Sequence, residues 1–367
     1  MTRRPVDRLL LLFALLLMAL GMVFIYSASA VKAFQVNPAG AAFLTRQLIG
    51  GGVGLVLMLI ATQAELGPLQ QDWKPLKIWY GVMIVLLLGV FAFHKINGAH
   101  RWMKLGPLSF QPSELFKPLA VLLAASWMAR NQDKWRSNKE ALPGLFRLML
   151  LLLPPLALIL KQPDFGTTFL IVFVVMLVVF LGGAPRWIFA IATPTLAVVG
   201  FLFVRLSAYR WERVTSFLHP DADPLGTGHQ ALQSLVAVGN GGFAGVGLGQ
   251  GMQKLFYLPE AHTDFIYAVI GEEAGLIGTL LVLALFVAIL WRGFRIARRC
   301  QDGFLSLCAM GFTLLLVVQA LMNMSVVLSL APNKGIPLPF ISYGPSSLMA
   351  SLLILGLLLS VSKDTAA

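Results

Sequence analysis

Long runs of apolar residues recur along almost the whole chain, separated by short polar segments. Each run approaches the ~20 residues that an α-helix needs to cross about 30 Å of hydrocarbon. The pattern therefore predicts an all-α integral membrane protein with about ten transmembrane helices. We place the spans at 9–28, 43–61, 77–93, 113–129, 145–160, 165–183, 187–205, 265–290, 304–328 and 345–361.

Three stretches of this pattern differ from a plain apolar span. The span at 113–129 begins with Glu114 and Lys117, which are unusual at membrane depth. Spans 145–160 and 165–183 are separated only by residues 161–164, where Pro163 favours a turn over one long helix. The first apolar run resembles a signal peptide, but it exceeds the usual 7–15 residues, so we expect a retained helix.

Composition supports one polytopic domain, 1–367, over several soluble ones. The chain has 367 residues, of which 58% are hydrophobic and 12% charged, and its mean hydropathy is +0.81. Soluble domains carry roughly 25% charged residues. The two cysteines lie near the predicted inner face, in a reducing compartment, and we expect no disulfide between them.

The placement of lysine and arginine predicts the orientation. Predicted inner segments carry about 16 of these residues and outer segments about 12, and the clusters at 130–139 and 292–299 both fall inside. We therefore predict that both termini are cytoplasmic and that 206–264 forms a large extracytoplasmic loop. Orientation does not explain the basic residues in polar outer loops. Binding an anionic substrate is one explanation for them.

Two outer segments carry polar residues beyond what a connection needs. Segment 97–117 contains Arg101 and, one turn into an apolar run, Lys117. A lysine at that depth usually faces a bundle interior or a wet cavity. Segment 161–168 contains Asp164, which either serves a site or simply caps the next helix.

The loop at 206–264 combines a basic segment around Arg210 with a glycine-rich stretch at 239–251 that leads to Lys254. The glycine stretch lacks the Gly-Lys-Ser/Thr ending of a nucleotide loop. We expect tight turns and close backbone packing from it. Neither a nucleotide nor a nucleic acid is an expected partner.

The loop ends in a dense polar cluster at the start of a predicted span: Glu260, His262, Thr263 and Asp264. Thr263 or Asp264 alone is explained by capping the helix. Adjacent carboxylates, Glu272 and Glu273, follow inside the same predicted helix. Intramembrane acids are costly and indicate function or an ion pair, for which Lys117 is a candidate partner.

Three prolines interrupt the segment 331–344, which therefore cannot be a continuous helix. Its backbone must find other partners, which predicts a re-entrant or cavity-lining loop. The segment carries Lys334 without a charged neighbour in sequence, and Ser342.

In this order, these segments resemble the SEDS family of bacterial shape, elongation, division and sporulation proteins. The resemblance covers nearly the whole chain. The motifs are most similar to those of the division members, with the elongation members as second choice. One departure is Pro345, where the family has a second glycine. The matching motifs are YSAS at 26–29, NGAHRW at 97–102, QPSE at 111–114, QPDFG at 162–166, YRWER at 209–213, PEAHTDFI at 259–266, NKG at 333–335 and PLPFISYG at 337–344.

The resemblance implies a peptidoglycan glycosyltransferase that polymerises lipid II on the outer face of the cytoplasmic membrane, releasing undecaprenyl pyrophosphate. It implies the class B penicillin-binding transpeptidase and other divisome membrane proteins as partners, and the division septum as location. Asp264 matches the family's essential aspartate. It would act as a base, or would hold a divalent cation, Mg²⁺ or Mn²⁺.

Binding roles are expected for the other polar residues of these segments: Arg101, Lys117, Arg210, Lys254, Glu260, His262, Thr263, Lys334 and Ser342. A helix macrodipole would lower the pKa of Asp264, whereas burial or Glu260 would raise it. Two alternatives come from other classes: a lipid II flippase, and a non-catalytic scaffold. The chain shows no convincing inverted repeat of the kind many transporters have.

Overall fold

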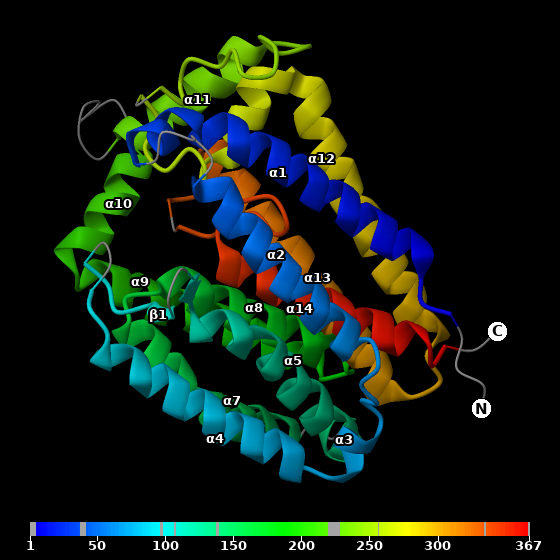
Figure 1. Cartoon of the computed structure of the whole chain (residues 1–367). Helices are drawn as coiled ribbons and strands as arrows, with labels where there is room; N and C mark the ends of the chain where they lie inside the picture. Colours follow the sequence, from blue (N-terminus) through cyan, green and yellow to red (C-terminus); the bar gives the residue numbers. More distant parts are fainter. Residues whose placement is uncertain are drawn as a thin grey trace.

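The computed structural model describes residues 5–36, 42–95, 98–105, 108–136, 139–218, 228–255, 257–333 and 335–365. Within these ranges the chain is predominantly helical, with one short pair of strands, which confirms the predicted all-α class (Figure 1). The elements are α1 (Arg8–Val36), α2 (Ala42–Ala61), α3 (Pro68–Gln71), α4 (Lys74–Gly89), η1 (Val90–Ala92), β1 (Met103–Leu105), β2 (Leu108–Phe110), α5 (Pro112–Arg130), α6 (Gln132–Arg136), α7 (Ala141–Lys161), α8 (Phe165–Leu181), α9 (Arg186–Arg205), α10 (Ala208–Leu218), α11 (His229–Gly241), α12 (Ile266–Arg299), α13 (Gly303–Val327) and α14 (Pro345–Ser362).

Ten long helices coincide with the ten predicted spans. Eight of them are long and apolar enough to cross a membrane. The other two are α8, which has 17 residues, and α5, which carries Glu114, Lys117 and Arg130. The number of spans and the cytoplasmic position of both termini remain predictions. The predicted turn between spans is confirmed, because α7 ends at Lys161 and Asp164 caps α8.

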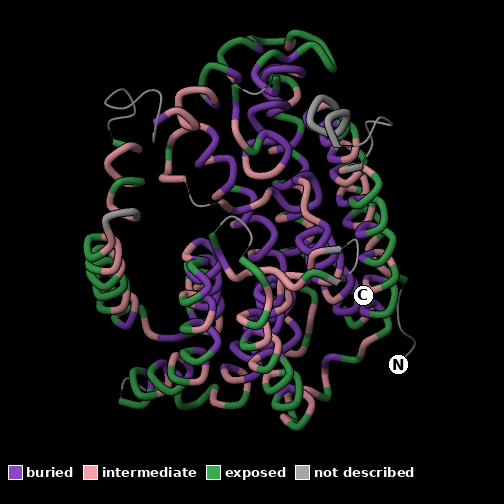
Figure 2. The backbone as a smooth tube through the Cα atoms, turned by 60° about the vertical axis from the view of Figure 1, so that its left-hand side comes forward, coloured by how far each residue is buried: buried purple, intermediate pink, exposed green. Residues whose placement is uncertain are grey.

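The helices differ strongly in how far the bundle encloses them. In α14, 89% of the residues in its 18-residue apolar stretch are buried inside the protein, against 6% in the corresponding stretch of α9. The buried core runs through the middle of the molecule, and exposed residues face outward (Figure 2). Helix α13 packs against α5, α8, α12 and α14, and α2 lies along α14. Because α14 is apolar on all sides, it suits this central position.

Pro345 opens α14 at its first position, where a missing backbone N–H leaves no bond unmade. The departure from the family motif therefore starts the last helix at the predicted place. Gly50 of α2 lies against this proline, and an added Cβ there would approach the Pro345 Cβ to 2.7 Å. A small residue lets the two helices meet.

Helix α12 has 34 residues and is broken at Gly275, whose φ is +64°. The glycine-rich stretch predicted to pack closely lies against this break. Gly242 and Phe243 accept hydrogen bonds from Leu276 N and Ile277 N, at 3.0 and 3.3 Å. An added Cβ at Gly241 would lie 1.8 Å from the Gly271 carbonyl oxygen. Only glycine allows this approach, so the prediction for 239–251 is confirmed.

Candidate active site

Asp264 lies in a turn that precedes α12, not in the helix. The helix begins at Ile266, its N-cap is Phe265, and no side chain caps it. The capping explanation for Thr263 and Asp264 is therefore wrong. Glu272 and Glu273 lie inside α12, whereas Asp264 precedes it.

The segment 331–344 holds this turn in place. Asn323 of α13 donates its side-chain N–H groups to the carbonyl oxygens of Asp264 and Ile336, at 2.7 and 2.8 Å. Ser342 Oγ donates to the Thr263 carbonyl oxygen at 2.6 Å. Tyr343 N donates to the His262 carbonyl oxygen at 2.9 Å. Two segments far apart in sequence are thus hydrogen-bonded into one backbone unit around Asp264.

Buried side chains satisfy the non-helical backbone of 331–344, as predicted. Gln47 of α2 donates to the Ser342 carbonyl oxygen at 3.1 Å and accepts from Gly344 N at 3.0 Å. Gln319 of α13 donates to the Pro337 carbonyl oxygen at 2.8 Å. An irregular backbone is tolerated at membrane depth only with such partners. Lys334 lies outside the described residues.

Asp264 as a whole residue is half-buried, and the surroundings of its carboxyl group oppose ionisation. Burial first, and the Glu260 carboxylate second, raise the pKa of Asp264 from 3.8 to about 6, with Asp164 acting in the same direction. Arg101 and Arg213 pull the pKa down and are outweighed. The net direction is the one expected from burial and Glu260, so the pKa is raised rather than lowered.

Two residues close to Asp264, Glu260 and Gly335, have positive backbone φ angles. Glu260 has a φ of +54°, and its carboxylate accepts from Thr263 Oγ1 at 2.9 Å. Gly335 has a φ of +59°, and an added Cβ would lie 3.2 Å from Asp264 Oδ2. Glycine therefore lets the 331–344 segment approach the carboxylate closely. Glu260, Thr263 and Ser342 therefore lie in the same hydrogen-bonded turn region as Asp264, and their substrate-binding roles stay predictions.

His262 is buried beside this unit and contacts two aromatic rings. Its ring centroid lies 4.9 Å from that of Phe43 and 5.5 Å from that of Tyr343. The contacts pack the turn against α2 and the end of segment 331–344. They indicate a positioning role for His262 in this structure.

Two arginines, both in segments predicted to lie outside the membrane, act electrostatically on the Asp264 carboxyl. Arg101 donates to the carbonyl oxygens of Gln162, at 3.1 Å, and of Pro163. Arg213 of α10 donates to the Asn333 carbonyl oxygen at 3.3 Å. The sequence reasoning missed Arg213 and chose Arg210 from the same helix.

Arg210 has a local role instead. Its guanidinium lies 3.7 Å from the Phe203 ring centroid and donates to the Phe203 carbonyl oxygen at 3.0 Å. It therefore fixes the corner between α9 and α10. Both arginines belong to the same basic segment. The orientation of α10 decides that Arg213, and not Arg210, acts electrostatically on the Asp264 carboxyl.

Lys117 is fully buried in α5 and belongs to a chain of polar contacts. Its ammonium donates to Glu114 Oε2 at 2.6 Å and to Gln319 Oε1 at 2.7 Å. Gln319 in turn holds Pro337. The predicted interior position of Lys117 is confirmed, but pairing with Glu272 or Glu273 is wrong.

Asp164 caps α8 by accepting from Thr167 N at 3.1 Å. Its other oxygen accepts from Gln111 Nε2 at 3.1 Å. The capping role is therefore confirmed. Asp164 also lies close enough to raise the pKa of Asp264, so the same carboxylate contributes to the field of the site.

Lys254, Glu272 and Glu273 form a separate buried network under the glycine-rich stretch. Lys254 Nζ donates to Glu273 Oε1 at 2.6 Å and to Ser27 Oγ of α1 at 2.8 Å. Glu272 accepts from the backbone N–H groups of Met252 and Gln253, at 2.9 and 3.2 Å. These three residues tie the loop to α1 and α12 and make no contact with Asp264 among the described residues.

Residues that offer metal ligands are few around Asp264. The described part of the chain contains no group of three or more histidine, cysteine, aspartate or glutamate residues that would enclose an ion. Mg²⁺ is commonly held by one or two carboxylates together with substrate phosphates. Asp264 and Glu260 could supply these two carboxylates. The divalent cation stays a prediction.

Comparison with known proteins identifies the family. The family model FTSW_RODA_SPOVE, described as "Cell cycle protein", matches residues 7–367. The chain belongs to the FtsW, RodA and SpoVE family. The SEDS resemblance is thereby confirmed.

Individual relatives of this family match over nearly their full length. A "Probable peptidoglycan glycosyltransferase FtsW" of Trichlorobacter lovleyi is 42% identical and covers 97% of this chain and 93% of its own. "Stage V sporulation protein E" of Bacillus subtilis is 38% identical, covering 97% of each chain.

Solved structures share the fold. A chain from "Structural coordination of polymerization and crosslinking by a peptidoglycan synthase complex" is 35% identical, with a TM-score of 0.77 and 98% of each chain covered. The Thermus thermophilus "Rod shape determining protein RodA" is 31% identical with a TM-score of 0.69, covering 99% of this chain and 98% of its own. This family member is therefore a helical multi-pass membrane protein.

Proposed function

We propose that this chain is a peptidoglycan glycosyltransferase that polymerises lipid II into glycan strands during cell division. The relatives named as peptidoglycan glycosyltransferases support the activity. The observation that carries the proposal is Asp264, whose turn is held by hydrogen bonds from Asn323 and Ser342. Glu260, Arg101 and Arg213 act electrostatically on its carboxyl, and its pKa is raised to about 6.

The reaction requires a base for the acceptor sugar. The O4 oxygen of N-acetylglucosamine attacks C1 of N-acetylmuramic acid, the bond from C1 to the pyrophosphate oxygen breaks, and the hydroxyl proton leaves O4. Asp264 accepts that proton. A pKa of about 6 leaves the carboxylate ionised at neutral pH while making it a stronger base than an ordinary aspartate.

The reaction also requires cations where the pyrophosphate charge develops. Arg101 and Arg213 have that role, because both act electrostatically on the Asp264 carboxyl and both come from outer elements. Lys117 is engaged by Glu114 and Gln319, so it positions the 331–344 segment. Undecaprenyl chains would lie between helices of the bundle.

A divalent cation, Mg²⁺ or Mn²⁺, is an additional proposal. Asp264 and Glu260 would hold it, and it would neutralise charge on the departing pyrophosphate. A class B penicillin-binding transpeptidase is the proposed partner, since a solved relative of the fold belongs to a complex described as coordinating polymerisation and crosslinking. We place the protein, with other divisome membrane proteins, at the septum of the bacterial cytoplasmic membrane.

Lipid II polymerisation by the purified chain with its transpeptidase tests the proposal. Asp264→Asn should abolish glycan strands, whereas Asp302→Asn, a matched change at the start of α13, should keep them. If Asp264→Asn polymerises normally, the proposed base is wrong. If neither wild type nor variant polymerises but lipid II crosses vesicle membranes, the chain is a flippase. If neither activity appears while the transpeptidase binds, it is a scaffold.

A further inference from the structure

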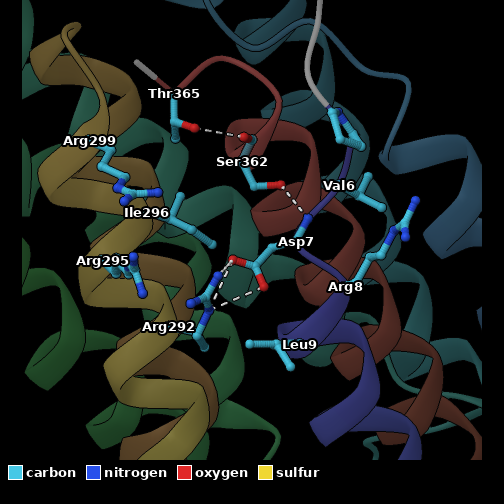
Figure 3. Close-up of a pocket in the computed structure, with 11 residues that line it drawn as sticks. Val6, Asp7, Arg8, Leu9, Arg292, Arg295, Ile296, Arg299, Ser362 and Thr365 are labelled. Atoms are coloured by element: carbon cyan, nitrogen blue, oxygen red, sulfur yellow. Dashed lines mark hydrogen bonds and ion pairs between the residues drawn. The ribbon is translucent and has the colours of Figure 1, made fainter. Parts of the chain in front are cut away.

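Three chain segments meet at the end of the molecule that is predicted to face the cytoplasm. They are the start of α1 and the C-terminal ends of α12 and α14 (Figure 3). A cavity of about 350 Å³ lies between them. None of its lining residues belongs to the site around Asp264, so an inference from this cavity is independent of the proposed function.

The cavity carries an excess of positive charge. Its lining includes Arg8, Arg292, Arg295 and Arg299, with Asp7 as the lining acid. Asp7 is engaged by Arg292, whose Nε donates to both carboxylate oxygens at 3.2 and 3.1 Å (Figure 3). Within the described chain, the other three arginines form no ion pair with a carboxylate.

A second hollow, of about 610 Å³, adjoins the first along α12. Val287, Leu290, Trp291 and Phe294 line it at spacings of three and four residues, so they share one face of the helix. The two hollows have Arg295 and Arg299 in common. An apolar groove of this kind therefore leads along the helix to a cationic rim, completed by Arg298.

Arginines at a helix C-terminus favour the macrodipole and set orientation. These two effects explain the arginines, but they do not explain the apolar hollow beside them or the Trp291 and Phe294 side chains that line it. Arg295, Arg298 and Arg299 are exposed, and among the described residues none of them forms an ion pair with a carboxylate. Arg295 lies over the Trp291 ring, 5.6 Å from its centroid, so the rim and the groove are in contact. A phosphate with an attached hydrocarbon chain matches both the rim and the groove.

We propose that this surface binds one anionic phospholipid. Its phosphate lies against Arg295, Arg298 and Arg299, and an acyl chain lies along Val287 to Phe294. The apolar groove selects a membrane lipid over a soluble phosphate, and the charge selects an anionic headgroup over a zwitterionic one. Bound there, the lipid covers the junction of α1, α12 and α14.

Native mass spectrometry of the purified full chain in detergent tests the site. Phosphatidylglycerol should bind more tightly than phosphatidylcholine with the same acyl chains. The triple variant Arg295→Gln, Arg298→Gln, Arg299→Gln should weaken phosphatidylglycerol binding at least tenfold, about 1.4 kcal/mol. The matched control Lys77→Gln, Lys134→Gln, Lys139→Gln removes equal charge from other exposed, predicted inner positions and should change binding little. Equal loss in both triples, or equal affinity for the two lipids, overturns the proposal.

Trp291→Ser tests the groove without changing any charge. It should weaken phosphatidylglycerol binding severalfold and leave the secondary structure, measured by circular dichroism, unchanged. Unaltered affinity would mean that no acyl chain lies there. Glycerol phosphate should fail to displace the lipid; displacement would assign the rim to soluble phosphates instead.

Discussion

Replacing Asp264 by asparagine should stabilise the fold while it abolishes glycosyl transfer. In the folded chain the pKa of Asp264 rises from 3.8 to about 6, because burial and Glu260 oppose its charge. The native protein therefore holds a carboxylate that ionises more easily in the unfolded chain. Asparagine keeps the shape of the side chain and removes that penalty.

The magnitude follows from the pKa change. A difference of roughly 2 units corresponds to about 3 kcal/mol, at ~1.4 kcal/mol per unit. For a raised pKa, the stability due to the group is fully present below 3.8 and is lost as pH rises through about 6. The advantage of Asp264→Asn over wild type should approach about 3 kcal/mol near pH 8 and shrink to about 1 kcal/mol near pH 4.5.

Thermal unfolding in detergent at both pH values measures this difference. The apparent Tm of Asp264→Asn should exceed that of wild type by a few degrees near pH 8 and by less near pH 4.5. Asp302→Ala is the control, because that carboxylate caps α13 through Phe304 N and Leu305 N and its loss should cost ~1 kcal/mol. If Asp302→Ala melts lower while Asp264→Asn melts no higher than wild type near pH 8, the electrostatic reasoning is refuted.

Three further predictions concern charges and backbone around the site. Glu260→Gln should move the acidic limb of the pH–rate profile for polymerisation to lower pH, because Glu260 raises the pKa of the base; Arg213→Gln should move it to higher pH. Lys254→Met leaves a buried glutamate without its ammonium partner and should lower the free energy of unfolding by about 3 to 5 kcal/mol. Gly275→Ala should lower the apparent Tm, because its φ is +64° and the added Cβ would lie 2.4 Å from Gly245 N; Gly81→Ala meets open space in α4 and should gain about 1 kcal/mol.

Each of these predictions has an outcome that contradicts it. If Glu260→Gln and Arg213→Gln shift the acidic limb in the same direction, Glu260 and Arg213 do not act through the charge of the base. A Lys254→Met protein as stable as wild type would mean that Ser27 and the Gly249 N–H satisfy the glutamate alone. Equal changes at Gly275 and Gly81 would mean that the break in α12 is not strained by a side chain.

The hydrophobic pattern alone predicted ten helices where the structure has them, because burying about twenty apolar residues in lipid leaves few other solutions. Local chemistry was equally direct at two positions. Pro163 ended one helix, and Asp164 capped the next by accepting from Thr167 N. Three prolines made 331–344 irregular. In these cases the cause lies within a few residues of its effect.

Predictions failed where partners come from distant helices. Lys117 was paired with Glu272 or Glu273, but its partners are Glu114 and Gln319. Arg210 was chosen for the site instead of Arg213, because sequence spacing does not say which way α10 turns its side chains. The pKa direction of Asp264 had two opposing local causes, and its burial decided the result.

The sequence by itself determined the membrane class, the helices and the irregular segment, since hydropathy and proline geometry need no tertiary partner. The catalytic role of Asp264 stays a prediction from a local motif. Only the tertiary structure decided which side chains meet. It joined Thr263 to Ser342 and the Asp264 backbone to Asn323, and it fixed the glycine-rich stretch against the break in α12. The physical reason is that electrostatic and hydrogen-bond energies depend on distances of a few ångströms, which packing sets and sequence separation does not.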